Sequence, residues 1–220
     1  MFDMSYLALI VVTLIIGLGA QAYVDMKLKK YSNVPVSNGI TGAEAARRML
    51  EYYGVEDVQI RPGQNGQDFF DPRTNSVSLS PEAFGATSVT ALATACHEVG
   101  HACQFAQGYQ PMKIRTAIVP VVNFASNAWV FILMIGIFMN LIGLVDVAIV
   151  LYALVVLFSL VTLPVEFNAS HRALVYMGEI ALPAEERAGA KSVLTACALT
   201  YVAAALSSIL QLLWLLGRRD

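Results

Sequence analysis

Charged residues are scarce in this chain of 220 residues, in which Asp, Glu, Lys and Arg make up only 14%. Soluble domains carry about 25%, so the low charge excludes an ordinary soluble domain. The formal net charge of −2 gives no reason to expect a nucleic-acid partner. The three cysteines have neither metal-binding nor redox spacing and indicate no disulfide framework. Histidine is equally rare, with three residues, so the position of each one is informative.

Hydrophobic residues, by contrast, make up 57% of the chain and gather in long apolar runs. Each run is long enough to cross a bilayer of about 30 Å as a helix. The predicted fold class is therefore a mainly α membrane protein with four transmembrane helices. We predict these helices at residues 5–24, 117–142, 145–164 and 193–216. A short turn at Gly143 separates the second helix from the third.

Positive charge is concentrated in two of the segments that connect these helices. Residues 25–116 hold nine of the 14 Lys and Arg residues, and residues 165–192 hold three more. Cytoplasmic segments are enriched in Lys and Arg, so both segments are predicted to face the cytoplasm, with the N-terminus outside. The lipid bilayer is thus the first predicted partner, whereas the sequence does not indicate an oligomeric state.

The cytoplasmic segment 25–116 is predicted to be a small α+β domain with a short sheet. Alternating serines and apolar residues within it are typical of a half-buried strand. We predict this strand to be the exposed edge of the sheet, to which an extended peptide substrate adds. The alternative is an ordinary strand that closes a small core. The residues of the predicted edge strand are Ser76, Val77, Ser78, Leu79 and Ser80.

Two of the three histidines lie in the segment His97-Glu98-Val99-Gly100-His101, within a predicted helix over about 88–107. Side chains at positions i and i+4 share one helix face, so both imidazoles can hold one metal ion. Glu98 lies about 100° further round the helix. From there it can reach a water molecule on the metal and act as general base. The motif predicts a zinc-hydrolase site.

A catalytic zinc site needs a third protein ligand and an open position. Gln104 and Gln107 stand where the metzincin pattern has a glycine and a third histidine, which excludes that class. Glu166 follows the third predicted span on the side of the motif, and we predict it as the third ligand. His171 is the rival ligand, although it points about 140° away from Glu166 on a helix. Three residues are candidates to hydrogen-bond a ligand or stabilise the oxyanion: His171, Ser170 and Arg172.

A family resemblance rests on the first span, on the turn at Asp71-Pro72 and on three further segments. These segments are SVTALATACHEVGHACQ, LPVEFNASHRAL and LTACALTYVAAAL. From about residue 5 to 216, the chain resembles bacterial membrane zinc metallopeptidases of the YugP type, relatives of the HtpX and CAAX-prenyl proteases. This resemblance implies a bacterial inner-membrane location and a zincin-like domain. It also implies one zinc ion per chain, bound by His97, His101 and Glu166, with Glu98 as catalytic acid/base. Phe69 stands where the family usually has histidine, so no polar role is expected there.

The sequence thus predicts a gluzincin-like membrane endopeptidase with its active site facing the cytoplasm and a protein or peptide as substrate. Two alternatives stay open. In the first, the helix over 88–108 crosses the bilayer itself, as in an intramembrane zinc protease. In the second, the metal only holds together a non-catalytic membrane adaptor. Glu98 favours an enzyme, because a purely structural metal site does not need a general base.

Overall fold

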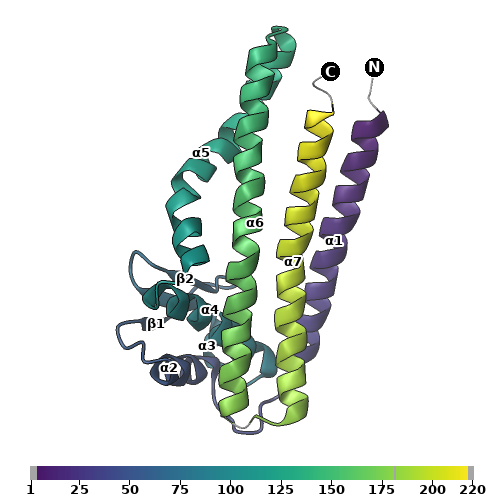
Figure 1. Ribbon diagram of the computed structural model, residues 1–220. Coiled ribbons are helices and arrows are strands. Elements are labelled where there is room, and N and C mark those ends of the chain that lie inside the picture. Colours follow the sequence, from purple (N-terminus) through teal and green to yellow (C-terminus); the bar gives the residue numbers. More distant parts are fainter. Residues whose placement is uncertain (1–3, 181, 218–220) are drawn as a thin grey trace.

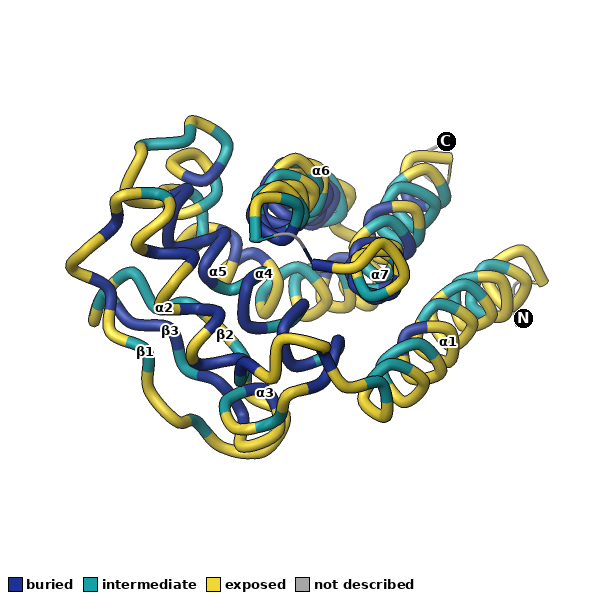
Figure 2. Tube along the Cα trace, turned by 90° about the horizontal axis from the view of Figure 1, so that it is seen from below, coloured by how far each residue is buried: buried dark blue, intermediate teal, exposed yellow. Residues whose placement is uncertain are grey.

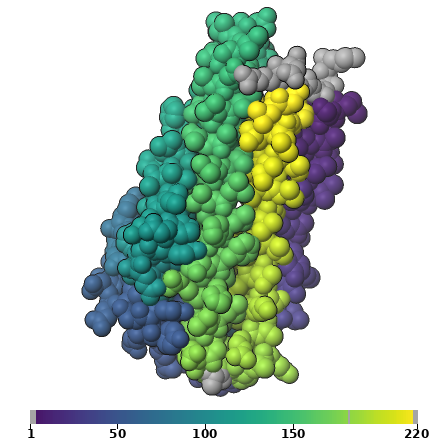
Figure 3. Space-filling view, viewed as in Figure 1, coloured from purple at the N-terminus to yellow at the C-terminus, as the bar shows by residue number. Residues whose placement is uncertain are grey.

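Four long helices dominate the computed structural model, which describes residues 4–180 and 182–217. Each of them is long and apolar enough to cross a membrane. They stand as a tall slab, and a small globular unit lies against one end of it (Figure 1, Figure 3). The prediction of a mainly α membrane protein with four candidate spans is confirmed. The helices are α1 (Met4–Ser32), α5 (Gln110–Phe138), α6 (Ile142–Glu179) and α7 (Ala184–Leu216).

The long helices extend beyond the predicted spans. In α6, the third span was predicted to end at Pro164, and proline inside a helix removes one main-chain hydrogen bond. The helix instead continues through Pro164 for 38 residues in all, packed against α4, α5 and α7. Most of the predicted segment 165–192 is therefore helical. The turn between α5 and α6 also lies before Gly143, at residues 139–141, where Asn140 has a left-handed φ of 56°.

The globular unit contains three shorter helices and a three-stranded sheet. The first helix begins with a capping box: the Thr41 side chain accepts from the Glu44 N–H at 3.2 Å, and the Glu44 carboxylate accepts from the Thr41 N–H at 2.8 Å. The elements are α2 (Gly42–Tyr52), β1 (Gln59–Pro62), β2 (Phe69–Asp71), β3 (Ser76–Leu79), α3 (Pro81–Gly85) and α4 (Val89–Ala106).

The sheet has the order β1-β3-β2, which overturns one prediction from the sequence. Strand β3 pairs with β1 in parallel and with β2 antiparallel, so it is the central strand. The prediction that this strand is the exposed edge is wrong. Its two apolar residues and its first serine are buried, in keeping with a strand that has a neighbour on each side. The residues concerned are Ser76, Val77, Ser78 and Leu79, followed by Ser80, which caps α3.

Helix α4 lies at the centre of the globular unit. It packs against α2, α3, α6 and α7, and most of its residues are buried. Figure 2 shows the buried backbone gathered around α4 and β3, whereas α1 is largely exposed. Among the described residues, α4 is not one of the helices apolar and long enough to be a candidate span. The alternative in which the motif helix crosses the bilayer is therefore not supported.

Candidate metal centre

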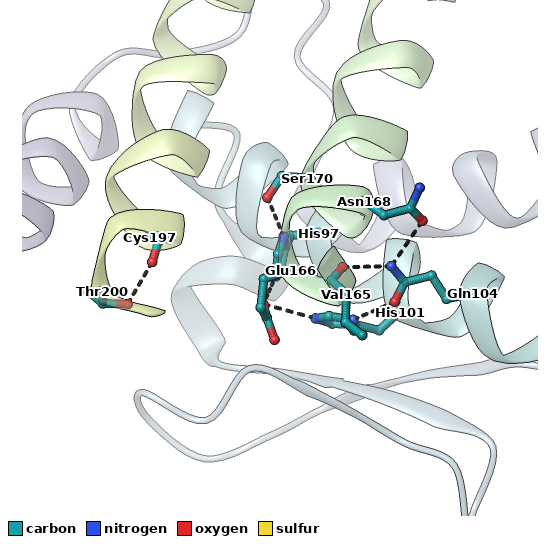
Figure 4. Close-up of polar contacts among 9 residues, drawn as sticks. All are labelled: His97, His101, Gln104, Val165, Glu166, Asn168, Ser170, Cys197 and Thr200. Atoms are coloured by element: carbon teal, nitrogen blue, oxygen red, sulfur yellow. Dashed lines mark hydrogen bonds and ion pairs between the residues drawn. The ribbon is translucent and has the colours of Figure 1, made fainter. Parts of the chain in front are cut away.

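Three side chains from two helices converge beside the globular unit (Figure 4). His97 and His101 lie one turn apart on α4, and Glu166 comes from α6. The Oε2 atom of Glu166 is 3.2 Å from Nε2 of His97 and 3.5 Å from Nε2 of His101. The ligand atoms of the three residues all lie within 4.8 Å of one another. The group could hold one metal ion.

The spacing of these atoms fits zinc. Ligand atoms about 2.0–2.1 Å from a tetrahedral zinc ion lie about 3.3 Å apart, close to the two distances between Glu166 and the histidines. Two imidazole nitrogens and one carboxylate oxygen are also donors that zinc accepts. Only 2% of Glu166 is exposed. A buried carboxylate is costly unless it is paired, and a cation between the three residues would supply that pairing.

The outward nitrogen of each histidine is held by a hydrogen-bond partner. Nδ1 of His97 lies 3.1 Å from the Ser170 hydroxyl, and Nδ1 of His101 lies 3.1 Å from Oε1 of Gln104. Both rings therefore turn Nε2 toward Glu166. Because the amide oxygen of Gln104 can only accept, the hydrogen of His101 resides on Nδ1, which leaves Nε2 free to bind a metal.

Gln104 is fully buried and ties α4 to α6. Its Nε2 donates to the Val165 carbonyl at 2.7 Å and to Oδ1 of Asn168 at 3.0 Å. The same Asn168 oxygen accepts from Nε of Arg172 at 2.8 Å. With both donors used, the amide cannot rotate without losing these bonds. Its oxygen is thus fixed toward His101.

Gly100, between the two histidines, lies at a close approach of α4 to α6. A Cβ atom at this position would lie 2.6 Å from the carbonyl oxygen and 2.9 Å from the Cα of Ala169. Both distances are far below ordinary van der Waals contact. Only glycine allows the main chains to approach so closely, and this approach brings the histidines of one helix to the glutamate of the other.

Glu98 lies beside the three converging residues and is half-buried. Burial raises the pKa of its carboxyl above the ordinary value, against the opposing effect of His97 and His101. The negative charges of Glu166 and Asp68 raise that pKa further. A carboxyl whose pKa is shifted toward neutrality is suited to both accept and return a proton.

The remaining predicted residues have distinct surroundings. Ser170 contacts His97, as described. His171 is exposed on α6 and lines a shallow pocket with Lys191 of α7, so the structure does not bring it to the metal group. Arg172 donates to Oε1 of Gln107 at 2.6 Å and stacks on the Tyr53 ring. It therefore reaches the histidines only through Asn168 and Gln104.

Sequence reasoning missed two side chains at the site. Gln104 lies three residues after His101 on the same helix face, so its spacing alone could have indicated a partner for that ring. Tyr201 of α7, which lies near Glu166 and Glu98, gave no such signal, because it lies on another helix. Phe69, where the chain departs from the family pattern, lies on β2, pairs with Ser78 and is 43% exposed.

Comparison with known proteins assigns the chain to a family. The family described as "Putative neutral zinc metallopeptidase" matches residues 6–219. A protein of Bacillus subtilis (strain 168), named "Putative membrane protease YugP", is 41% identical over 212 residues, which cover 96% of this chain and 94% of the relative. No solved structure matches the chain. Because the match spans nearly its whole length, the chain belongs to this family of neutral zinc metallopeptidases, as its sequence predicted.

Proposed function

We propose that this protein is a membrane endopeptidase that hydrolyses peptide bonds at a single zinc ion. The observation that carries the proposal is the convergence of His97 and His101 on Glu166, whose Oε2 lies 3.2 and 3.5 Å from their Nε2 atoms, with Glu98 beside them. Three protein ligands leave the fourth position of a tetrahedral zinc ion open, which is the mark of a catalytic site.

Each residue of the site has a chemical role in this proposal. His97, His101 and Glu166 would hold the zinc ion, which would supply Lewis-acid chemistry and activate water for attack. The Glu98 carboxylate accepts the proton of the attacking water and passes it to the leaving amine. The Tyr201 hydroxyl, next to Glu166, is the donor placed to stabilise the oxyanion that develops on the carbonyl.

The site is proposed to face the cytoplasm, close to the membrane surface. Glu166 lies 24 residues after the start of α6, a rise of about 36 Å. A hydrocarbon core of about 30 Å that begins at Ile142 therefore ends before Glu166. The basic residues of the segments around the motif favour the cytoplasmic side.

Labelling of introduced cysteines tests this orientation. We expect Lys27→Cys and Lys113→Cys to react from the same, cytoplasmic side of sealed membranes. Gly143→Cys, at the exposed far end of α6, should react only from the opposite side. Reaction of Lys27→Cys and Lys113→Cys from opposite sides would instead place the motif helix across the bilayer.

The sheet offers a different edge for the substrate than the one predicted from the sequence. Strand β2 is a free edge, and it is joined to α4 by the Phe70 ring, which lies 5.7 Å from the Phe105 ring. Extended peptides bind such edges through main-chain hydrogen bonds. We therefore propose β2 as the strand to which the peptide substrate adds.

The Glu98→Gln variant separates an enzyme from a non-catalytic adaptor. Glutamine keeps the size of the side chain but cannot accept a proton as a base. We expect the variant to retain zinc and to lose zinc-dependent hydrolysis of an unfolded protein such as casein. Glu51→Gln, an exposed change on α2, is the matched control and should keep both. Hydrolysis that survives in Glu98→Gln would rule out the proposed role of Glu98.

A further inference from the structure

A cavity of about 540 Å³ lies between α1, α3, α4 and α7. Its volume is in the range of about 300–1,000 Å³ that is typical of ligand sites. Lys29 and Ser32 line it from α1, Thr94 from α4 and Cys197 from α7. The Thr90 hydroxyl, also in its wall, donates to the Leu28 carbonyl at 3.0 Å and anchors α1 to α4. The cavity is called the α1–α4 channel below.

The channel ends one helical turn before the proposed site on both α4 and α7. Thr94 lies four residues before Glu98, so both side chains share one face of the helix. Cys197 lies four residues before Tyr201 and is likewise one helical turn from the site. Figure 4 shows the α7 turn with Cys197 beside the metal-binding residues. An extended chain that leaves the channel along these two helices would therefore come next to the proposed reacting atoms.

The channel also meets the free edge of the sheet. Asp68, in its wall, immediately precedes Phe69, the first residue of β2. A peptide paired with β2 would leave the sheet at Phe69 and pass into the channel. The Asp68 carboxylate is already bonded to Ser80, whose N–H donates at 2.7 Å and whose hydroxyl donates at 3.2 Å. The Asp68 carboxylate is therefore bound within the wall of the channel and is not a free charge for a ligand.

The lining of the channel suits a polypeptide better than a lipid tail. Apart from Lys29, Asp68 and Glu82, the lining residues are serines, threonines, alanines, one cysteine and one leucine. The charged side chains of Lys29 and Glu82 in the wall would be costly against an acyl chain. Most lining hydroxyls already donate within the protein, but their oxygens can still accept from the main-chain N–H groups of an extended peptide. Small side chains also leave room for the side chains of the substrate.

We propose that the α1–α4 channel holds an extended stretch of the polypeptide substrate on one side of the cleaved bond, with α1 as its outer wall. This inference rests on the proposed peptidase function. It makes α1 part of the substrate site as well as a candidate membrane span. Folded proteins are too wide for the channel, so the substrate class is unfolded or locally extended polypeptide.

A cysteine on the α1 wall tests the channel. Ser32→Cys lines it, and Lys30→Cys, two residues earlier and exposed, does not. Both are made in the zinc-loaded full chain with Cys197→Ser, and each is compared before and after reaction with a bulky maleimide. We expect labelling at position 32 to lower kcat/KM for casein by about tenfold or more, with bound zinc unchanged. Labelling at position 30 should have little effect.

A second readout does not depend on turnover. With Glu98→Gln added, casein should slow maleimide labelling of Ser32→Cys but not of Lys30→Cys. Protection of Ser32→Cys by a fatty acid and not by casein would overturn the proposal in favour of a lipid site. Hydrolysis that is unchanged after labelling at position 32 would overturn the channel alone. Absence of zinc-dependent hydrolysis in the unlabelled, zinc-loaded protein would overturn the proposed function, and the channel with it.

Discussion

Replacing Gly100 by alanine adds one methyl group at the contact between α4 and α6. The new Cβ would lie 2.6 Å from the carbonyl oxygen of Ala169, whereas ordinary contact begins at 3.4 Å. The helices must therefore separate by about 0.8 Å locally, the difference between these two distances. Zinc sites keep their ligand distances to within about 0.2 Å. A shift of this size moves His97 and His101 away from Glu166 by more than a bound ion allows.

The expected magnitude follows from the cost of overpacking. Forcing an extra methyl group into a packed contact costs about 1–3 kcal/mol. Zinc binding would have to pull the two helices together against that strain, so we expect the zinc affinity to fall about tenfold to a hundredfold. Competition with a fluorescent zinc chelator measures this change on the detergent-purified chain, and thermal unfolding shows that the variant is folded.

Two further variants make the Gly100 prediction specific. Gly143→Ala adds a methyl group to α6 at a place with nothing within 4 Å, and it should leave zinc affinity unchanged. Ala169→Gly should not rescue Gly100→Ala, because the clash is with main-chain atoms that the second change does not remove. An unchanged zinc affinity in a folded Gly100→Ala protein would refute the close helix contact as the reason for this glycine.

Three other predictions concern the surroundings of the metal. Gln104→Leu removes the partner of His101 and leaves the Val165 carbonyl without its donor. Zinc affinity, measured by chelator competition, should therefore fall about 10–100-fold. An unchanged affinity would exclude Gln104 as the residue that orients His101. Tyr201→Phe should keep zinc and KM while kcat falls about 100- to 1,000-fold; loss of zinc in this variant would mean that the hydroxyl only orients Glu166. His171→Ala should keep both zinc content and activity, because the side chain is exposed, and a loss of bound zinc would restore it as a ligand.

Local motifs and the hydropathy of the sequence predicted the positions of the three metal-binding residues. The i, i+4 spacing of His97 and His101 depends only on helix geometry, which one segment encodes. The count of apolar runs placed Glu166 on the side of the motif, since an even number of crossings returns the chain to the same side. Both inferences agree with the positions in the structure, where the three side chains meet.

Features that depend on tertiary packing were not predictable in this way. Strands β1 and β2 have four and three residues, too few to show a pattern that orders them around β3. Pro164 signals a helix end locally, yet packing keeps α6 continuous. Tyr201 and Glu166 lie near each other on different helices, so no spacing within one helix relates them. The need for glycine at position 100 becomes visible only when Ala169 lies against it.

Bound zinc per chain, measured by elemental analysis on wild type and Glu166→Ala side by side, tests the proposed site most directly. Glu179→Ala, an exposed change on the same helix, is the matched control. We expect about one zinc ion per chain in wild type and in the control, and a clear loss in Glu166→Ala. If Glu166→Ala holds zinc as tightly as wild type, the ion is not bound between α4 and α6, and the proposed catalytic centre is wrong.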